Sequence, residues 1–250
     1  LECIASIGVG HVGGCLSVAD LLAGLYTKHM NVGPRDPQMK GRDRLVMSKG
    51  HAGPALYATL ASFGFFPKEM LKTLNKIGTR LPSHCNMQLT PGVDMTTGSL
   101  GQGISCAVGM AIGAKIAREK ARVYCVIGDG ESQEGQVWEA VMLAAHRKLG
   151  NFTLFVDNNG MQIDDTTQNI VAVEDYEKKF KAFGFNAIRV DGHNHSAIDM
   201  AIEKAKRCKT RPTAIILDTV KGKGVSFIEE MGVGNHSFSF GAAELEKALA

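Results

Sequence analysis

Apolar residues follow two alternating patterns along the chain. Short, largely apolar runs, typical of strands buried on both faces of a parallel sheet, occur at 44–47, 123–127, 153–156, 187–190 and 213–217. Apolar positions at helical spacing occur at 17–30, 56–62, 68–76, 136–149 and 196–208. Strands that alternate with helices predict an α/β fold: a doubly wound, mostly parallel sheet with helices on both faces.

Local signals predict the ends of some helices and their packing. Ser17 and Asp20 have the spacing of a capping box, so we expect a helix from Ser17 to about Met30. Gly150 is predicted to be the C-terminal glycine of the helix at 136–149. Small residues stand at every second position from Gly101 to Gly113, which predicts a helix that packs closely against a neighbour.

The chain shows no internal repeat and no linker. A length of 250 residues would allow two domains, but we expect a single domain over 1–250. Leu1, Ile4 and Ile7 look like the end of an amphipathic helix, so the start of that helix is expected to be missing. Residues 77–97 are predicted to form a long loop, and long loops in compact domains are often functional.

Composition and charge exclude several classes of protein. Hydrophobic residues make up 44% and charged residues 21%, which is typical of a globular protein and not of a disordered one. The net charge of +3 is spread along the chain, so neither a nucleic-acid groove nor an anionic membrane surface is predicted. The longest weakly polar run, 100–114, is shorter than the ~20 residues of a membrane span.

The cysteines show no pattern of a metal or disulfide site. No C-x-x-C pair occurs among them, and we expect reduced thiols in a cytoplasmic protein. They are Cys3, Cys15, Cys85, Cys106, Cys125 and Cys208. Glycine is unusually frequent, at 29 residues against 7 prolines, which indicates tight turns and close backbone contacts.

Polar residues follow three of the predicted strands. Ser48–His51 comes after the first, Gly128-Asp129-Gly130 after the second and Asn158-Asn159 after the third. The carboxyl ends of parallel strands meet at one edge of a sheet, where ligands bind. The oxygens of Asp129 and Asn159 are hard donors suited to Mg²⁺ or Ca²⁺. Gly-Asp-Gly by itself is also common in tight turns, so the combination with Asn159 is what favours a metal site.

These motifs resemble a known family. Gly128–Gly135 (G-D-G-E-S-Q-E-G) followed by Asn158-Asn159 resembles the thiamine diphosphate fingerprint. Three further segments match the diphosphate-binding domain of transketolase in the family's order, namely Gly10–Gly14, Ser48–Ala52 and Thr96–Gly103. The resemblance runs from residue 1 to about residue 230.

The resemblance implies a cofactor and a metal. Asp129, Asn159 and the main-chain carbonyl of Met161 would ligate Mg²⁺, with Ca²⁺ or Mn²⁺ as alternatives. The metal would bridge the two phosphates of thiamine diphosphate and offset their charge. The residues that would contact the cofactor itself are His51, Gly98, Ser99, Leu100, Gly130 and His236.

Three histidines and one glutamate would take part in the chemistry. His11, His84 and His236 match histidines that surround the hydroxyl and carbonyl groups of the substrate, and neutral imidazoles suit proton transfer to such oxygens. The loop at 232–236 departs from the family by lacking the usual aromatic residue and the glycine after the histidine. Glu134 matches a glutamate that links two cofactor sites across a subunit interface, or it simply begins the next helix.

The resemblance also implies a partner. Thiamine chemistry needs a carboxylic acid against the aminopyrimidine, and in this family that acid lies in a pyrimidine-binding domain beyond the matched segment. We therefore expect the N-terminal subunit of a split transketolase, inactive alone and assembled into an α2β2 heterotetramer with a C-terminal subunit. It would transfer a two-carbon ketol unit from a ketose phosphate to an aldose phosphate, as in the pentose phosphate pathway.

Other interpretations are weaker. The first component of a 2-oxoacid dehydrogenase or a deoxyxylulose-phosphate synthase would share G-D-G and N-N but not the two histidine loops together. A non-catalytic remnant would have no reason to keep Asp129 and Asn159. Gly8–Gly13 satisfies G-x-G-x-x-G but follows a helical pattern instead of a strand, so it does not indicate a dinucleotide site. Lys221–Gly224 lacks the spacing of a phosphate loop and is predicted to be a turn.

Overall fold

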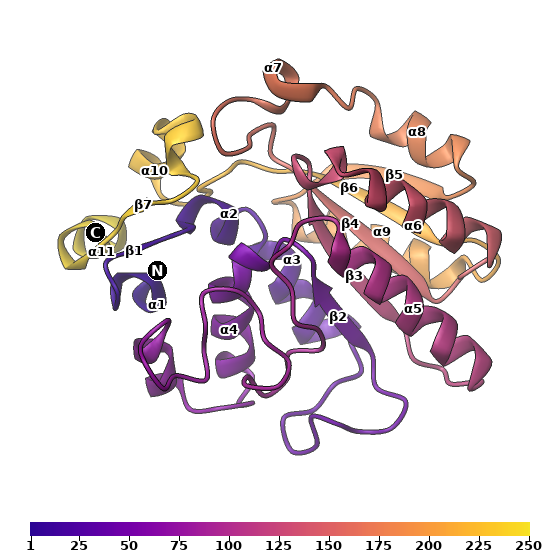
Figure 1. The fold of residues 1–250 in the computed structure, drawn as a ribbon, viewed down its shortest axis with the longest axis horizontal. Coiled ribbons are helices and arrows are strands. Elements are labelled where there is room, and N and C mark those ends of the chain that lie inside the picture. Colours follow the sequence, from indigo (N-terminus) through magenta and orange to yellow (C-terminus); the bar gives the residue numbers. More distant parts are fainter.

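A five-stranded parallel sheet forms the centre of the fold. The structure, a computed structural model, describes residues 1–250. The strand order is β2-β3-β4-β6-β5, and all four neighbouring pairs are parallel (Figure 1). The strands are β2 (Arg44–Met47), β3 (Val123–Gly128), β4 (Phe152–Asn158), β5 (Asn186–Asp191) and β6 (Thr213–Asp218). The predicted doubly wound α/β fold is therefore confirmed.

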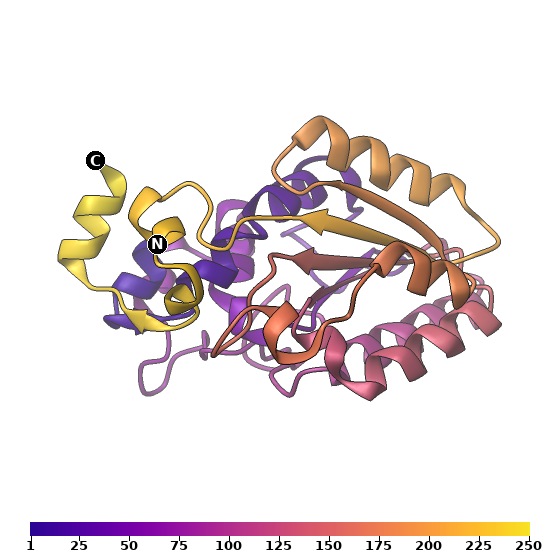
Figure 2. The same ribbon diagram turned by 90° about the horizontal axis from the view of Figure 1, so that it is seen from above.

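Helices cover both faces of this sheet (Figure 2). The helices that pack on one face are α1 (Glu2–Ala5), α2 (Val12–Leu16), α3 (Ala19–Gly24), α4 (Gly53–Ser62) and α9 (His195–Arg207). Those on the other face are α5 (Gln102–Ile116), α6 (Gly135–His146) and α8 (Tyr176–Ala182). Each face has its own core, of 33 and 22 buried residues.

The two cores explain why the strands read as continuous apolar runs. In β3, Tyr124 and Val126 belong to the first core, while Val123, Cys125 and Ile127 belong to the second. Successive side chains point to opposite faces, and both faces are covered, so every position of the strand must be apolar.

Shorter elements complete the chain. β1 (Val9–Gly10) pairs antiparallel with β7 (Phe238–Ser239), which brings the first and last segments side by side (Figure 1). The remaining elements are the π-helix η1 (Leu25–His29), the 3-10 helices η2 (Gly50–Ala52), η3 (Lys68–Thr73), η4 (Glu131–Gln133) and η5 (Gly232–Asn235), and α7 (Thr167–Val171), α10 (Ser226–Glu230) and α11 (Ala242–Leu249). Not one helix has the length and apolar character needed to cross a membrane.

Two predicted helix boundaries are wrong. Ser17 is not a helix cap, because its hydroxyl donates to the buried Asp157 carboxylate (2.7 Å) and to the Gly14 carbonyl (3.2 Å). The predicted helix is α3 followed by η1. Gly150 does not end α6 either, because the left-handed residue after that helix is Lys148, with φ 51°.

The small residues of α5 are in close contact with a neighbouring segment only at the start of the helix. A Cβ on Gly103 would lie 2.8 Å from the Ser48 Cα, so the expected close packing holds at the start of the helix. At Gly109 and Gly113 nothing lies within 4 Å of the same position, so close packing was wrongly predicted there within this chain.

Candidate active site

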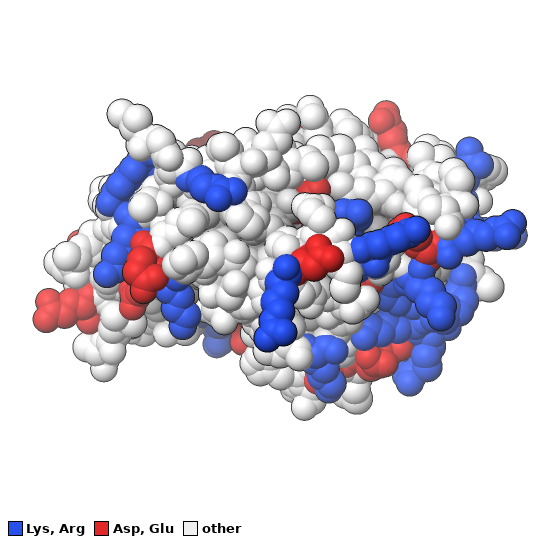
Figure 3. All heavy atoms as spheres, turned by 90° about the horizontal axis from the view of Figure 1, so that it is seen from below, with Lys and Arg blue, Asp and Glu red and all other residues white.

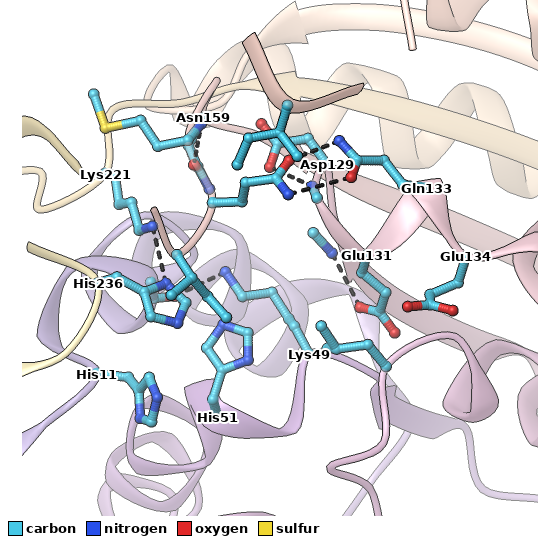
Figure 4. Close-up of a pocket in the computed structure, with 18 of the residues that line it drawn as sticks. His11, Lys49, His51, Asp129, Glu131, Gln133, Glu134, Asn159, Lys221 and His236 are labelled. Carbon is cyan, nitrogen blue, oxygen red and sulfur yellow. Dashed lines mark hydrogen bonds between the residues drawn. The ribbon is translucent and has the colours of Figure 1, made fainter. Parts of the chain in front are cut away.

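A cavity of about 530 Å³ opens at the carboxyl edge of the sheet (Figure 4). We call it the catalytic cavity. It brings together nearly all the residues singled out in the sequence, namely His11, His51, His84, Gly98, Leu100, Asp129, Gly130, Glu134, Asn159, Met161 and His236. Ser99 does not line it, and its side chain is exposed beside Gln102. Residues from segments more than 200 positions apart thus share one space, because the parallel strands end at one edge of the sheet and the antiparallel pairing of β1 with β7 brings His11 and His236 to it.

Asp129 and Asn159 present oxygens at the ends of β3 and β4. Asp129 is 2% exposed, and its carboxylate accepts hydrogen bonds from the Gly130 N–H (2.8 Å) and the Gly160 N–H (2.5 Å). Burial, together with the charge of Asp157, raises the pKa of Asp129 to about 7. A buried carboxyl with so high a pKa is stabilised in its charged form by a cation.

The other two oxygens of the predicted metal site belong to Asn159 and Met161. Both residues follow β4, the strand that pairs with β3. Asn159 Oδ1 accepts from the Met161 N–H (3.1 Å), while Asn159 Nδ2 donates to Asp157 (3.0 Å), so the amide is held in one orientation. No group of three His, Cys, Asp or Glu side chains is placed to hold a metal ion. Any cation here would therefore rely on Asp129 with amide and main-chain oxygens, a donor set suited to Mg²⁺ or Ca²⁺.

A buried ion pair underlies the cavity. Lys49 is 2% and Asp157 0% exposed, and the ammonium contacts the carboxylate directly. Asp157 also accepts from Ser17, Thr219 and Asn159, so its charge is fully hydrogen-bonded and its pKa lies below the usual range, chiefly because of Lys49. Lys49 Nζ donates in addition to the Gly14 carbonyl (2.9 Å). Asp157 thus positions both Lys49 and Asn159.

Glu131 joins three of the loops that line the cavity. Its carboxylate accepts from the Ser48 hydroxyl (2.5 Å), the Gly101 N–H (2.9 Å) and the Gly128 N–H (3.2 Å). Glu131 is 2% exposed. Because one buried carboxylate satisfies three donors from separate segments, Glu131 fixes the relative positions of those loops.

Four histidines converge on one wall of the cavity. The ring centroid of His11 lies 5.2 Å from that of His51, 5.9 Å from that of His84 and 5.1 Å from that of His236. Burial lowers the pKa of His11, and lowers the pKa of His51 well below its ordinary value. Burial and the nearby Lys221 lower the pKa of His236 to about 4. The rings of His11, His51 and His236 are therefore neutral at pH 7 and offer both a donor and an acceptor nitrogen.

Lys221 is a second cation of the cavity. Its ammonium lies 3.1 Å from His236 Nδ1, and burial together with the charge of Lys49 lowers its pKa to about 8. An anionic ligand would stabilise the charged form of this buried ammonium. Lys221 would therefore be suited to hold a phosphate group in this cavity.

Glu134 lies at the rim, at the N-cap of α6, and its side chain is exposed and makes no capping hydrogen bond. That position suits both interpretations made from the sequence. A carboxylate there is favourable to the helix dipole, and it is also accessible to a second polypeptide.

Some residues of the cavity were missed in the sequence. Lys49 and Glu131 stand inside the matched motifs Ser48–Ala52 and Gly128–Gly135, so their position gave a signal. Lys221 was interpreted as part of a turn, which is correct for the backbone but overlooks the side chain. Nothing in the sequence indicates that Asp157 pairs with Lys49, 108 residues away.

Comparison with known proteins agrees with this geometry. Residues 1–249 match the family model of the "Transketolase, thiamine diphosphate binding domain". The chain belongs to the transketolase family. It is 51% identical over 253 residues to the 6-deoxy-6-sulfo-D-fructose transketolase subunit SqwG of Clostridium sp. (strain MSTE9), covering 99% of this chain and 92% of that protein. Over 236 residues it is 36% identical to one of the subunits of apulose-4-phosphate transketolase from Phocaeicola vulgatus, covering 94% and 84%.

Solved transketolase structures share the fold. The chain superposes on transketolase from Pichia stipitis with a TM-score of 0.93 at 32% identity, covering 99% of this chain and 38% of that one. For transketolase from Campylobacter jejuni the TM-score is 0.91 at 34% identity, covering 99% and 40%. The chain therefore spans about two fifths of these transketolases, and most of the two subunits named above.

Proposed function

We propose that this chain is the thiamine diphosphate-binding subunit of a split transketolase. The observation that carries the proposal is the convergence of Asp129, Asn159 and Met161 with two buried ammonium groups and four histidines in one cavity. The split arrangement is supported by relatives that are themselves named subunits and that this chain covers over 92% and 84% of their length.

Asp129, Asn159 and the Met161 carbonyl would hold Mg²⁺, and Lys221, His51 and the Gly130 N–H would contact the diphosphate. The Met161 carbonyl suits this role because no group of the chain donates a hydrogen bond to it. Main-chain groups of Gly98, Ser99 and Leu100 would lie against the cofactor. Bound thiamine diphosphate supplies an electron sink for cleaving a carbon–carbon bond next to a carbonyl.

The histidines would handle protons on the substrate. His11, His84 and His236 face the same space, so hydroxyl and carbonyl oxygens of a sugar would find a donor or an acceptor on each ring. Because the pKa values of His11 and His236 are lowered, these rings are neutral near pH 7, so each can accept a hydrogen bond from a substrate hydroxyl or donate one to a carbonyl oxygen. Lys221 next to His236 Nδ1 would fix the tautomer of that ring.

A second chain would complete the site. The proposed partner is a C-terminal subunit with the pyrimidine-binding domain, and an α2β2 assembly would place the exposed Glu134 against it. The substrates would be a ketose and an aldose with an anionic terminal group, a phosphate or the sulfonate that the name of the Clostridium relative includes. Six free thiols suit a reducing compartment such as the cytoplasm, where the pentose phosphate pathway operates.

Reconstitution tests the proposal. The chain is mixed with a C-terminal transketolase subunit from the same source, Mg²⁺ and thiamine diphosphate, and ketol transfer from phosphorylated and sulfonated ketoses to a panel of aldoses is measured. We expect transfer that needs both chains. Oxidative decarboxylation of a 2-oxo acid would favour another thiamine enzyme instead, and no turnover with any aldose would contradict the proposal.

A further inference from the structure

A second hollow lies at the opposite edge of the sheet from the catalytic cavity. It has a volume of about 460 Å³, and none of its nine lining residues is hydrophobic. The segments that follow α5, α6 and α9 and lead into β3, β4 and β6 form its walls. We call it the basic hollow. It is lined by Lys115, Arg118, Glu119, Lys120, Arg122, Lys148, Gly150, Asn151 and Lys209.

The charge of the basic hollow is strongly unbalanced. Six of the lining residues are cations and one, Glu119, is an acid. None of the six takes part in an ion pair, although one acid, Glu119, lines the same hollow and other lysines of the chain do pair with acids, as Lys181 does with Glu177. Figure 3 shows lysine and arginine side chains gathered at the end of the molecule where α5 and α6 finish in Figure 1.

Hydrogen bonds to the carbonyls of helix C-termini explain only two of these six cations. Lys115 Nζ donates to the carbonyls of Arg147 (2.7 Å) and Lys148 (3.3 Å), and the Arg122 guanidinium donates to the Lys206 carbonyl (2.6 Å). These two side chains offset the partial negative charge of the helix C-termini. The other four cations make no side-chain hydrogen bond within the chain, and they are Arg118, Lys120, Lys148 and Lys209.

The backbone places two of those four cations in an unusual conformation. Arg118 has φ 56° and Lys148 has φ 51°, and each directly follows the C-cap of its helix. Glycine is the usual residue at this left-handed position, because it has no Cβ. Both helices thus carry a lysine or arginine where a glycine would be less strained, and both side chains line the basic hollow.

A close backbone contact sets the spacing of the walls. A Cβ on Gly150 would lie 2.1 Å from the Lys209 carbonyl oxygen, so the segment before β4 packs directly on the segment before β6. Lys148 and Lys209 are carried by these two segments. Their separation is therefore fixed by the fold and not by flexible loops.

We propose that the basic hollow binds a compact anion that carries three or more negative charges on phosphate groups. Lysine and arginine are the side chains that bind phosphate oxygens best, and four of them here lack any other partner. No aromatic side chain lines the basic hollow, so a nucleobase would find no ring to stack on, and recognition would rest on phosphate charge. Because the basic hollow and the catalytic cavity share no lining residue, both can be occupied at once.

Calorimetric titration of the full chain with inorganic tripolyphosphate tests this site. It is done at low ionic strength with a chelator present, so that no metal competes. The key variant is Arg118→Gly/Lys148→Gly, which removes two cations and also relieves the left-handed backbone, so folding is preserved. We expect at least about tenfold weaker binding, with a shallower dependence on salt. The control is Lys68→Ala/Lys76→Ala, which also removes two cations, from exposed positions that do not line the basic hollow. It is expected to bind tripolyphosphate as the wild type does.

The catalytic cavity also contains cations, so a further variant must distinguish binding there from binding in the basic hollow. Lys221→Met acts only on the catalytic cavity, so the binding event that Arg118→Gly/Lys148→Gly weakens is expected to persist in this variant. Binding that is lost in Lys221→Met but kept in Arg118→Gly/Lys148→Gly would overturn the proposal. So would equal affinity for sulfate and tripolyphosphate, or no saturable binding by the wild type. If the thermal midpoint of the glycine variant is lowered, Lys120→Ala/Lys209→Ala gives the same comparison without touching the helix ends.

Discussion

The Lys49 ammonium contacts the Asp157 carboxylate at the base of the catalytic cavity, with both side chains almost completely buried. Asp157 also accepts hydrogen bonds from Ser17, Thr219 and Asn159, so a single carboxylate organises groups from four segments. Residues that line the cavity depend on this pair even though Asp157 itself does not line it.

Replacing Lys49 is expected to destabilise the fold strongly. Lys49→Met leaves the Asp157 charge buried without its partner, which costs about 3–5 kcal/mol in the free energy of unfolding. Adding Asp157→Asn to the same chain should recover part of the loss, because the charge is then removed too. Urea unfolding measures both, with Lys204→Met on the exposed face of α9 as a control within about 0.5 kcal/mol of the wild type. Equal stability of Lys49→Met and the wild type would contradict the pairing.

Glu131→Gln tests whether the Glu131 carboxylate holds the loops at Ser48, Gly101 and Gly128 together. An amide NH2 cannot accept a hydrogen bond, so the Ser48 hydroxyl, the Gly101 N–H or the Gly128 N–H loses its partner. We expect a loss of about 1–3 kcal/mol in stability and weaker binding of thiamine diphosphate. Denaturant unfolding and calorimetry measure these effects. Glu230→Gln, at an exposed position, should change neither, and an unchanged Glu131→Gln would show that the loops are held in another way.

The pH dependence of stability tests the neutral state of His236. Its pKa is about 4 in the fold because of burial and Lys221, against about 6.5 for an unperturbed histidine. Between these values the unfolded chain binds a proton that the folded chain does not, so acidification from pH 6.5 towards 4 lowers the free energy of unfolding. The wild type should lose more stability over this window than His236→Gln. Identical pH slopes of the two proteins would mean that His236 titrates normally.

Replacing two glycines of α5 by alanine is expected to change stability in opposite directions. Gly103→Ala places a Cβ 2.5 Å from the Ser48 hydroxyl and 2.8 Å from its Cα, so the helix must shift away from the Ser48–His51 loop, and stability should fall. Gly109→Ala meets nothing within 4 Å and should raise the stability of the isolated chain by about 0.5–1 kcal/mol through helix propensity. Thermal unfolding of both variants checks the contrast, and a stabilising Gly103→Ala would refute the close contact.

The sequence predicts the sheet well because most of its strands are buried on both sides. All five apolar runs became strands: β2, β3, β4 and β6 are almost entirely buried, and the half-buried edge strand β5 still contains the apolar residues Ala187, Ile188 and Val190. Asp129 and Asn159 could be placed together for a topological reason: parallel strands bring their carboxyl ends to one edge.

The details that depend on tertiary partners could not be predicted. The Ser17 hydroxyl has the sequence context of a cap, but a buried carboxylate 140 residues away takes its hydrogen bond. Lys148 takes the left-handed position predicted for Gly150, while Gly150 packs against the Lys209 backbone, where a Cβ would not fit. These details depend on contacts between segments that are distant in the sequence, and local sequence patterns do not indicate them.

We propose that Asp129 anchors a metal through which thiamine diphosphate is held. Calorimetric titration of the full chain with thiamine diphosphate, with Mg²⁺ and with a chelator in its place, tests it most directly. Asp129→Ala is compared with Asp164→Asn, an exposed acid at the rim of the same cavity. We predict saturable binding that requires Mg²⁺, is lost in Asp129→Ala and is retained in Asp164→Asn. Binding of equal strength in the chelator, or in Asp129→Ala, would contradict the account.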